Sequence, residues 1–183
     1  MDTDTIRAAD APRRAAWPDV GRPVARHVAV AAHLTALTVL PSGVWRVVLG
    51  FGVTLGFDRA DLRADGIPGW GTVMVVALTV LTEALALLTL GLVRPWGEVV
   101  PRWVPGLAGR RIPPAAAVVP ATLGGIMLTF IWVFALVGVF TGRLDEISGA
   151  GWRALVIACY VPALLWGPLL LWVTWHYHRR RSG

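Results

Sequence analysis

Four long apolar runs, separated by short polar segments that contain glycine and proline, dominate the pattern of the chain. They cover about residues 28–49, 71–93, 115–140 and 154–175. Each run has the ~20 residues that a helix needs to cross the ~30 Å hydrocarbon layer of a bilayer. The pattern therefore predicts an all-α fold, a bundle of four transmembrane helices that forms one domain over residues 28–175.

The composition agrees with a membrane protein. Hydrophobic residues make up 56% of the chain and charged residues 15%, and the mean hydropathy is +0.63. Soluble domains have about 25% charged residues. The single cysteine, Cys159, lies in the fourth run, which excludes an intrachain disulfide and a cysteine-based zinc site. We expect no metal and no other cofactor.

The distribution of arginine predicts how the spans are oriented. All seventeen basic residues are arginine, and twelve of them lie in residues 1–27, in the loop after the second run and in residues 176–183. Short loops rich in arginine stay on the cytoplasmic side of a membrane. We therefore expect a multi-pass protein of the bacterial cell (inner) membrane with both termini in the cytoplasm. Residues 1–27 are expected to form a disordered tail and residues 176–183 a basic tail.

Five prolines and four arginines are concentrated in the loop of residues 91–114. The prolines exclude a long helix. The arginines alternate with tryptophan and valine, which suits the headgroup region of an anionic membrane, where each basic residue contributes about 1 kcal/mol. This alternation argues against nucleic acid, the other partner that the charge would suit. The predicted lipid-binding residues are Arg94, Arg102, Arg110, Arg111, Trp96 and Trp103.

The same loop carries a distinctive motif. Residues 94–98 read Arg-Pro-Trp-Gly-Glu, residues 101–103 read Pro-Arg-Trp, and residues 40–46 read "LPSGVWR". Over about residues 28–175, this pattern resembles a group of small actinobacterial integral membrane proteins. No activity is established for that group, so the resemblance implies the topology and a bacterial source but assigns no catalytic residues.

Three ionisable residues fall inside the apolar runs, where they are costly and usually face the bundle interior or water. They are His33 and Arg46 in the first run and Glu83 in the second. Counting ~1.5 Å per residue from the ends of the runs puts Glu83 level with His33 and not with Arg46. A Glu83–His33 pair could carry a proton, hold a cation or act as general acid and base. Alternatively, a protonated Glu83 bonds a helix carbonyl, Thr79 or Thr82.

Arg46 follows a potential helix break at Pro41-Ser42-Gly43. We expect Arg46 at the outer interface, where it reaches headgroups or an acid of the following loop. The break either shortens the first span or lines a cavity. By the same counting Trp166 falls at the depth of Glu83, where an aromatic wall beside the carboxyl would suit a lipophilic or cationic ligand, or equally plain packing. The candidate ligand-binding residues are Trp166, Arg46 and Trp45.

The sequence leaves three functions open. The first is a transport or small-ligand-binding module that uses Glu83 and His33. The second is a membrane enzyme that acts on a prenyl or lipid chain with Glu83 as the acid. The third is a non-catalytic subunit of a membrane complex. Four helices are few for a monomeric transporter, which favours a homodimer or a membrane partner protein. No phosphate-binding loop, zinc-protease motif or nucleophile elbow is present in the sequence.

Overall fold

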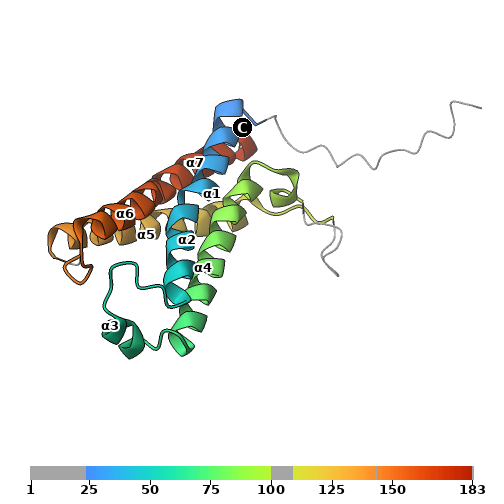
Figure 1. Ribbon diagram of the computed structural model, residues 1–183. Coiled ribbons are helices and arrows are strands. Elements are labelled where there is room, and N and C mark those ends of the chain that lie inside the picture. Colours follow the sequence, from blue (N-terminus) through green and yellow to red (C-terminus); the bar gives the residue numbers. More distant parts are fainter. Residues whose placement is uncertain (1–23, 100–108, 143, 183) are drawn as a thin grey trace, which may run out of the picture.

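The computed structural model describes residues 24–99, 109–142 and 144–182 (Figure 1). All the named elements in this part of the chain are helices. In chain order the elements are α1 (Arg26–Thr38), α2 (Leu40–Gly50), α3 (Arg59–Ala64), α4 (Trp70–Leu88), η1 (Thr89–Leu92), η2 (Pro95–Gly97), α5 (Pro114–Phe140), α6 (Ala150–Tyr160), η3 (Val161–Leu165) and α7 (Trp166–Ser182). Elements marked η are short 3-10 helices.

Four continuous helical segments are long and apolar enough to cross a membrane. They are Arg26–Gly50, Trp70–Leu92, Pro114–Phe140 and Ala150–Arg181. The all-α fold and the four apolar helices predicted from the sequence are therefore confirmed. The last helix continues through most of the segment expected to be a basic tail. Residues 1–23, and with them most of the predicted N-terminal tail, lie outside the described residues.

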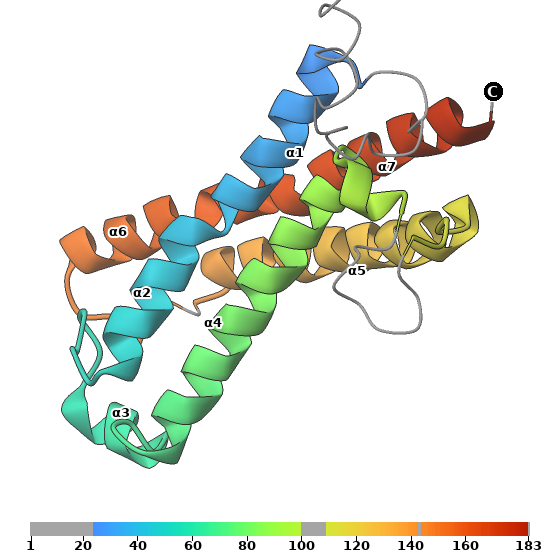
Figure 2. The same cartoon turned by 90° about the vertical axis from the view of Figure 1, so that its right-hand side faces the viewer.

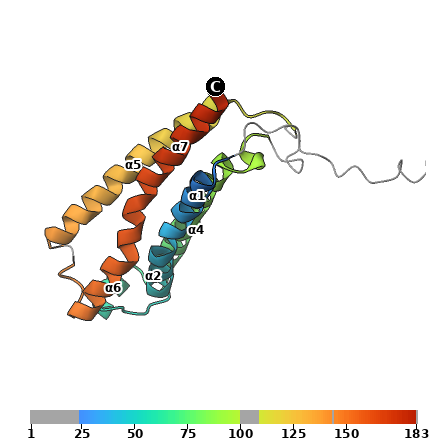
Figure 3. The ribbon, with the colours of Figure 1, turned by 90° about the horizontal axis from the view of Figure 1, so that it is seen from above.

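The spans form two helical hairpins. In the first, α4 packs on α2, and in the second, α5 packs on α7, while α1 packs against α7 and joins the hairpins (Figure 3). Figures 1 and 2 show the start of α1 and the end of α7 at one end of the molecule, which we call the terminal end. The opposite end, with α3 and the connection from α5 to α6, is called the loop end. The start of α1 and the end of α7 therefore lie at the same end of the bundle.

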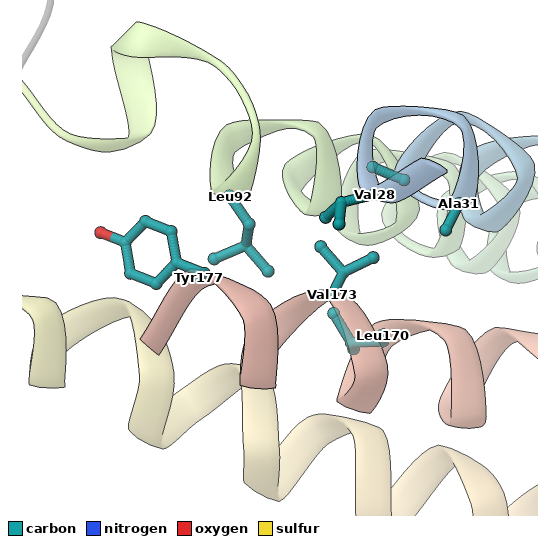
Figure 4. Close-up of a cluster of buried hydrophobic side chains, with 7 residues drawn as sticks. Val28, Ala31, Leu92, Leu170, Val173 and Tyr177 are labelled. Carbon is teal, nitrogen blue, oxygen red and sulfur yellow. The ribbon is translucent and has the colours of Figure 1, made fainter. Parts of the chain in front are cut away.

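A buried apolar cluster holds the two hairpins together at the terminal end (Figure 4). It forms where α1, η1 and α7 meet. In lipid, such packing rather than exclusion of water favours the association of helices. Its members are Val28, Ala31, Ala32, Leu92, Leu170, Val173 and Tyr177.

Val39 divides the first span into α1 and α2. Pro41 lies at the start of α2, where the missing N–H of proline is least disruptive, and the Ser42 hydroxyl donates to the Val39 carbonyl at 2.8 Å. The Pro-Ser-Gly sequence therefore accompanies a local interruption of the helix at Val39. The two helices α1 and α2 together still form one span of 25 residues.

In the second hairpin, α5 and α7 approach each other closely at two glycines. A Cβ atom on Gly167 of α7 would lie 2.8 Å from the carbonyl oxygen of Gly125 in α5, so the backbones approach closely there. Thr129 donates its hydroxyl hydrogen to the same Gly125 carbonyl at 2.7 Å. Small residues at a crossing are a common means of packing helices in lipid. This crossing fixes α5 on α7.

Candidate functional site

Glu83, in α4, turns its carboxyl toward α2 at Gly43. A Cβ atom on residue 43 would lie 2.5 Å from Oε1 of Glu83, so glycine leaves the room that the carboxyl occupies. Arg46 follows Gly43 by almost one turn of α2, and its charge acts electrostatically on Glu83. Opposite charges therefore share the interface between α2 and α4.

His33 has different neighbours. Its ring is exposed on α1, with Nδ1 2.6 Å from the carbonyl oxygen of Ala29 and Nε2 3.5 Å from Nη2 of Arg94. The structure does not bring His33 and Glu83 together. No hydrogen bond or ion pair joins His33 to Glu83 in the described part of the chain, and the functional role expected of the two residues stays a prediction.

The pairing of α2 with α4 explains this difference. Thr72 donates its hydroxyl hydrogen to the carbonyl of Gly50 at 2.6 Å, which sets the start of α4 against the end of α2. Side chains on a helix lean toward its N-terminus. Because the two helices are antiparallel, Glu83 and Arg46 lean toward each other. The depths estimated from the sequence assume only a fixed rise per residue. They therefore include neither the register of α4 against α2 nor the tilt of the two side chains along their helices.

The side chain of Arg46 is half-buried, and no ion pair joins it to an acid of the following loop in the described ranges. Its Nε and Nη2 are buried, as is Oε1 of Glu83, and these three atoms have no hydrogen-bond partner in the described part of the chain. Buried charges are costly unless they are compensated. No ion pair joins Arg46 to Glu83 in the described ranges, so the attraction between them acts across a gap and not through a direct contact.

An apolar pocket of about 330 Å³ lies at the loop end, between α2, α5, α6 and η3. Ligand pockets typically measure about 300–1,000 Å³ and are lined mainly by hydrophobic and aromatic side chains. Four aromatic residues contribute to this lining, together with aliphatic residues and the carboxylate of Glu146. The aromatic residues are Trp45, Phe57, Trp132 and Tyr160.

Tyr160 connects the pocket with the buried charges. Its ring lies 5.9 Å from that of Trp132, measured between centroids, and both residues line the pocket. The charge of Arg46 also acts electrostatically on the Tyr160 hydroxyl. Trp45, the neighbour of Arg46, is 5% exposed and forms another part of the pocket wall. Arg46 therefore directly follows a residue of the pocket wall in α2.

The predicted ligand-binding residues are only partly brought together. Trp45 lines the pocket and Arg46 lies behind its wall, whereas Trp166 does not belong to the lining. Trp166 packs instead with Val39 and Ala86 in a separate buried cluster, 3% exposed. Sequence reasoning missed the pocket residues Trp132 and Tyr160, because they come from two other spans and no local motif marks them.

A second polar cluster lies at the terminal end, around Glu98. Glu98 is 1% exposed, and its two carboxylate oxygens accept from two arginines of α7. Arg180 Nη2 lies 2.6 Å from Oε1, and Arg181 Nη1 lies 3.3 Å from Oε2. Arg181 Nη2 also donates to the carbonyl of Ile112 at 2.9 Å. We call these three charged residues the Glu98 clamp.

The Glu98 clamp was not predicted. Glu98 follows Arg-Pro-Trp-Gly in the chain, and the α7 arginines were interpreted as a solvated tail. The one indication in the sequence is Glu98 itself, which is the single acidic residue among the arginines of residues 91–114. A buried carboxylate requires compensation, and the arginines that supply it are more than eighty residues away in the sequence.

The residues predicted to bind lipid have mixed surroundings. Arg94 contacts His33, and Trp96 is 37% exposed and packs over Gly91. Arg110 and Arg111 are exposed, while Arg102 and Trp103 lie outside the described residues. Lipid binding by this loop stays a prediction.

No group of three or more His, Cys, Asp and Glu side chains in the described ranges could hold a metal ion. No protein-family model, no curated protein sequence and no solved structure matches this chain. The relationship to the actinobacterial group stays a prediction as well. Function must therefore be argued from the pocket and its charges.

Proposed function

We propose that this polytopic membrane protein binds a small lipophilic molecule in the apolar pocket between α2, α5 and α6. The observation that carries the proposal is the 330 Å³ pocket with four aromatic side chains in its wall. Protein interiors are otherwise packed as densely as organic crystals. A hollow of this size in a small helical protein indicates space for a ligand.

The charges around the pocket suggest how such a ligand would be oriented. Glu146 is the carboxylate of the pocket lining and is exposed, whereas Arg46 lies behind the inner wall formed by Trp45 and Tyr160. A cation is attracted by a carboxylate and by aromatic faces and repelled by a guanidinium. A ligand with an apolar body and a positive end would therefore place that end toward Glu146.

The arrangement supports ligand binding better than proton transfer or enzymatic chemistry. A general acid must come within hydrogen-bond reach of its substrate. Glu83 does not line the pocket, and its carboxyl faces Gly43 and Arg46. In our proposal Glu83 compensates the charge of Arg46 and has no direct contact with the ligand. The arginine-rich terminal end is placed in the cytoplasm, as the distribution of arginine suggests.

A fluorescent cation, 1-naphthylmethyl-trimethylammonium, and its neutral counterpart, 1-methylnaphthalene, test the proposal in lipid nanodiscs. We expect saturable binding of both probes above the level of empty nanodiscs, with the cation bound more tightly. Ala135→Trp places a large side chain in the pocket and should weaken binding at least tenfold. Leu123→Trp, on the exposed face of α5, is the matched control and should leave binding unchanged.

The charge assignment has its own test. Glu146→Gln should remove the preference for the cation while the neutral probe still binds. The proposal fails if neither probe saturates, or if Ala135→Trp and Leu123→Trp bind equally well.

A subunit of a membrane complex is the second candidate function. It is favoured by the position of Arg46 and Glu83 at the α2–α4 interface, where they fix the register of the two helices. In that case the Ala135→Trp variant would retain its biological phenotype, whereas variants on the exposed apolar surface of α5, such as Phe130→Ala, would lose it.

A further inference from the structure

An open groove of about 540 Å³ lies at the terminal end, between α1 and α7. It is independent of the aromatic pocket, which lies at the loop end. Both polar and apolar side chains form its walls. They are Arg26, His27, Val30, Ala31, Leu34 and Trp172.

Arg26 and His27 line one end of the groove, and further basic and aromatic side chains of α7 lie beside it, outside its lining. The imidazole of His27 lies 5.7 Å from that of His176 and 5.6 Å from the Trp172 ring, as measured between centroids. Arg179 lies over the Trp175 ring at 4.4 Å. Arg26 adds a second guanidinium at the start of α1.

No carboxylate compensates this charge within the described ranges. The ion pairs there join Arg153 to Asp145 and the two clamp arginines to Glu98. Glu83 faces Gly43. The groove wall therefore holds one arginine and one histidine, with His176 beside His27 and Arg179 farther along α7, and no acid pairs with these four residues in the described ranges.

The lower part of the groove is apolar. Arg26, Val30 and Leu34 follow one another at intervals of four residues, so they lie along one side of α1. Val30 is 50% and Leu34 48% exposed. The distance from residue 26 to residue 34 along the helix is roughly 12 Å. A cationic site thus continues into an apolar lane that runs in the direction of the hydrocarbon layer.

We propose that this groove binds one anionic phospholipid, with its phosphate between Arg26, His27 and Arg179 and an acyl chain along Val30 and Leu34. Charge complementarity selects this occupant, because the site holds cations and no acid. Residues 1–23, which precede the groove in the chain, contain four Asp and four Arg and offer no net negative charge. The inference does not depend on the proposed function of the aromatic pocket.

Native mass spectrometry of the full chain in detergent, titrated with dioleoylphosphatidylglycerol or dioleoylphosphatidylcholine, tests the inference. We expect one phosphatidylglycerol to bind at least tenfold more tightly than phosphatidylcholine. The Arg26→Gln/Arg179→Gln variant should lose about thirtyfold in affinity for phosphatidylglycerol, because each basic residue near an anionic lipid contributes roughly fivefold. Arg59→Gln/Arg63→Gln, on exposed α3 at the loop end, is the matched control and should bind as the unaltered chain does.

A second pair of variants tests the apolar lane along Val30 and Leu34, where the acyl chain is proposed to lie. Leu34→Trp fills the groove and should weaken phosphatidylglycerol binding at least fivefold, whereas Leu81→Trp, equally exposed on α4, should not. Equal binding of the two lipids, or unchanged affinity in the Arg26→Gln/Arg179→Gln variant, would overturn the inference. Unchanged affinity in Leu34→Trp would also overturn it, since the lipid would then lie elsewhere or residues 1–23 would occupy the groove.

Discussion

The carboxyl of Glu83 lies against the backbone of Gly43, on the helix face that also carries Arg46. This contact links the two unusual features of the first hairpin. The glycine of the Pro-Ser-Gly sequence provides space, and the acid on α4 uses that space to approach a buried cation. The helix break and the intramembrane charges therefore belong to one arrangement.

Gly43→Ala should destabilise the protein by about 1–3 kcal/mol, because the new Cβ would lie 2.5 Å from Glu83 Oε1 and either the carboxyl or the helix must shift. Gly124→Ala is the matched control, since a Cβ there meets nothing within 4 Å. That control should be neutral or stabilising, as alanine favours a helix over glycine. Unfolding in mixed detergent micelles measures both. Adding Glu83→Ala to Gly43→Ala should relieve the clash, and a lack of relief would contradict the geometry.

Arg46 and Glu83 should be coupled in a double-mutant cycle. Arg46→Gln and Glu83→Gln each leave one buried charge uncompensated, so the double variant should be about 1–3 kcal/mol more stable than the sum of the two effects indicates. His33→Ala combined with Glu83→Gln should be additive within about 0.5 kcal/mol, because these residues do not interact. The free energy of unfolding of all variants gives both coupling terms. Strong coupling to His33 instead would return Glu83 to the pair suggested by the sequence.

Glu98→Gln should cost about 3 kcal/mol in unfolding free energy, because it leaves Arg180 and Arg181 without their shared carboxylate in a buried site. Cleavage by trypsin after these arginines should become faster, as the end of α7 is released. Asp145→Asn provides the comparison. Asp145 pairs with Arg153 at 3.7 Å, but its side chain is 77% exposed and that of Arg153 is 42% exposed, so loss of this pair should cost less than about 1 kcal/mol. Equal effects of the two changes would show that Glu98 is not buried.

Gly167→Ala should weaken the second hairpin by at least about 2 kcal/mol. The added Cβ would meet Thr129 and would lie 2.8 Å from the carbonyl oxygen of Gly125, and backbone atoms cannot give way as a flexible side chain can. Gly151→Ala in α6, where a Cβ has open space, should have little effect. Disulfide crosslinking of cysteines placed in α5 and α7 would report the change in their distance. An unaltered crosslinking rate would argue against the close crossing.

The four helices could be predicted from the sequence because the requirement is local. Each span must satisfy its own backbone hydrogen bonds and present apolar side chains to lipid, so its composition is sufficient to identify it. The break at Pro41 was also recognisable, since proline acts on the backbone of its own helix.

The partners of the charged residues could not be predicted in this way. The register of α4 against α2 determines which residue faces Glu83. The Thr72–Gly50 hydrogen bond helps to fix this register, and it joins residues 22 positions apart in the sequence. The Glu98 clamp joins residues more than eighty positions apart. Identification of the pocket required three spans to be placed together in space. Periodicity and depth along single helices contain none of this information.

The position of Arg46 also has a consequence for biogenesis. Membrane proteins are inserted progressively as the ribosome delivers them, and an ionised acid that enters the bilayer alone is strongly disfavoured. Here the span with Arg46 is synthesised before the one with Glu83, and the short segment around α3 returns the chain directly to it. The first hairpin can thus enter the bilayer as a neutral pair, before either helix of the second hairpin has been made.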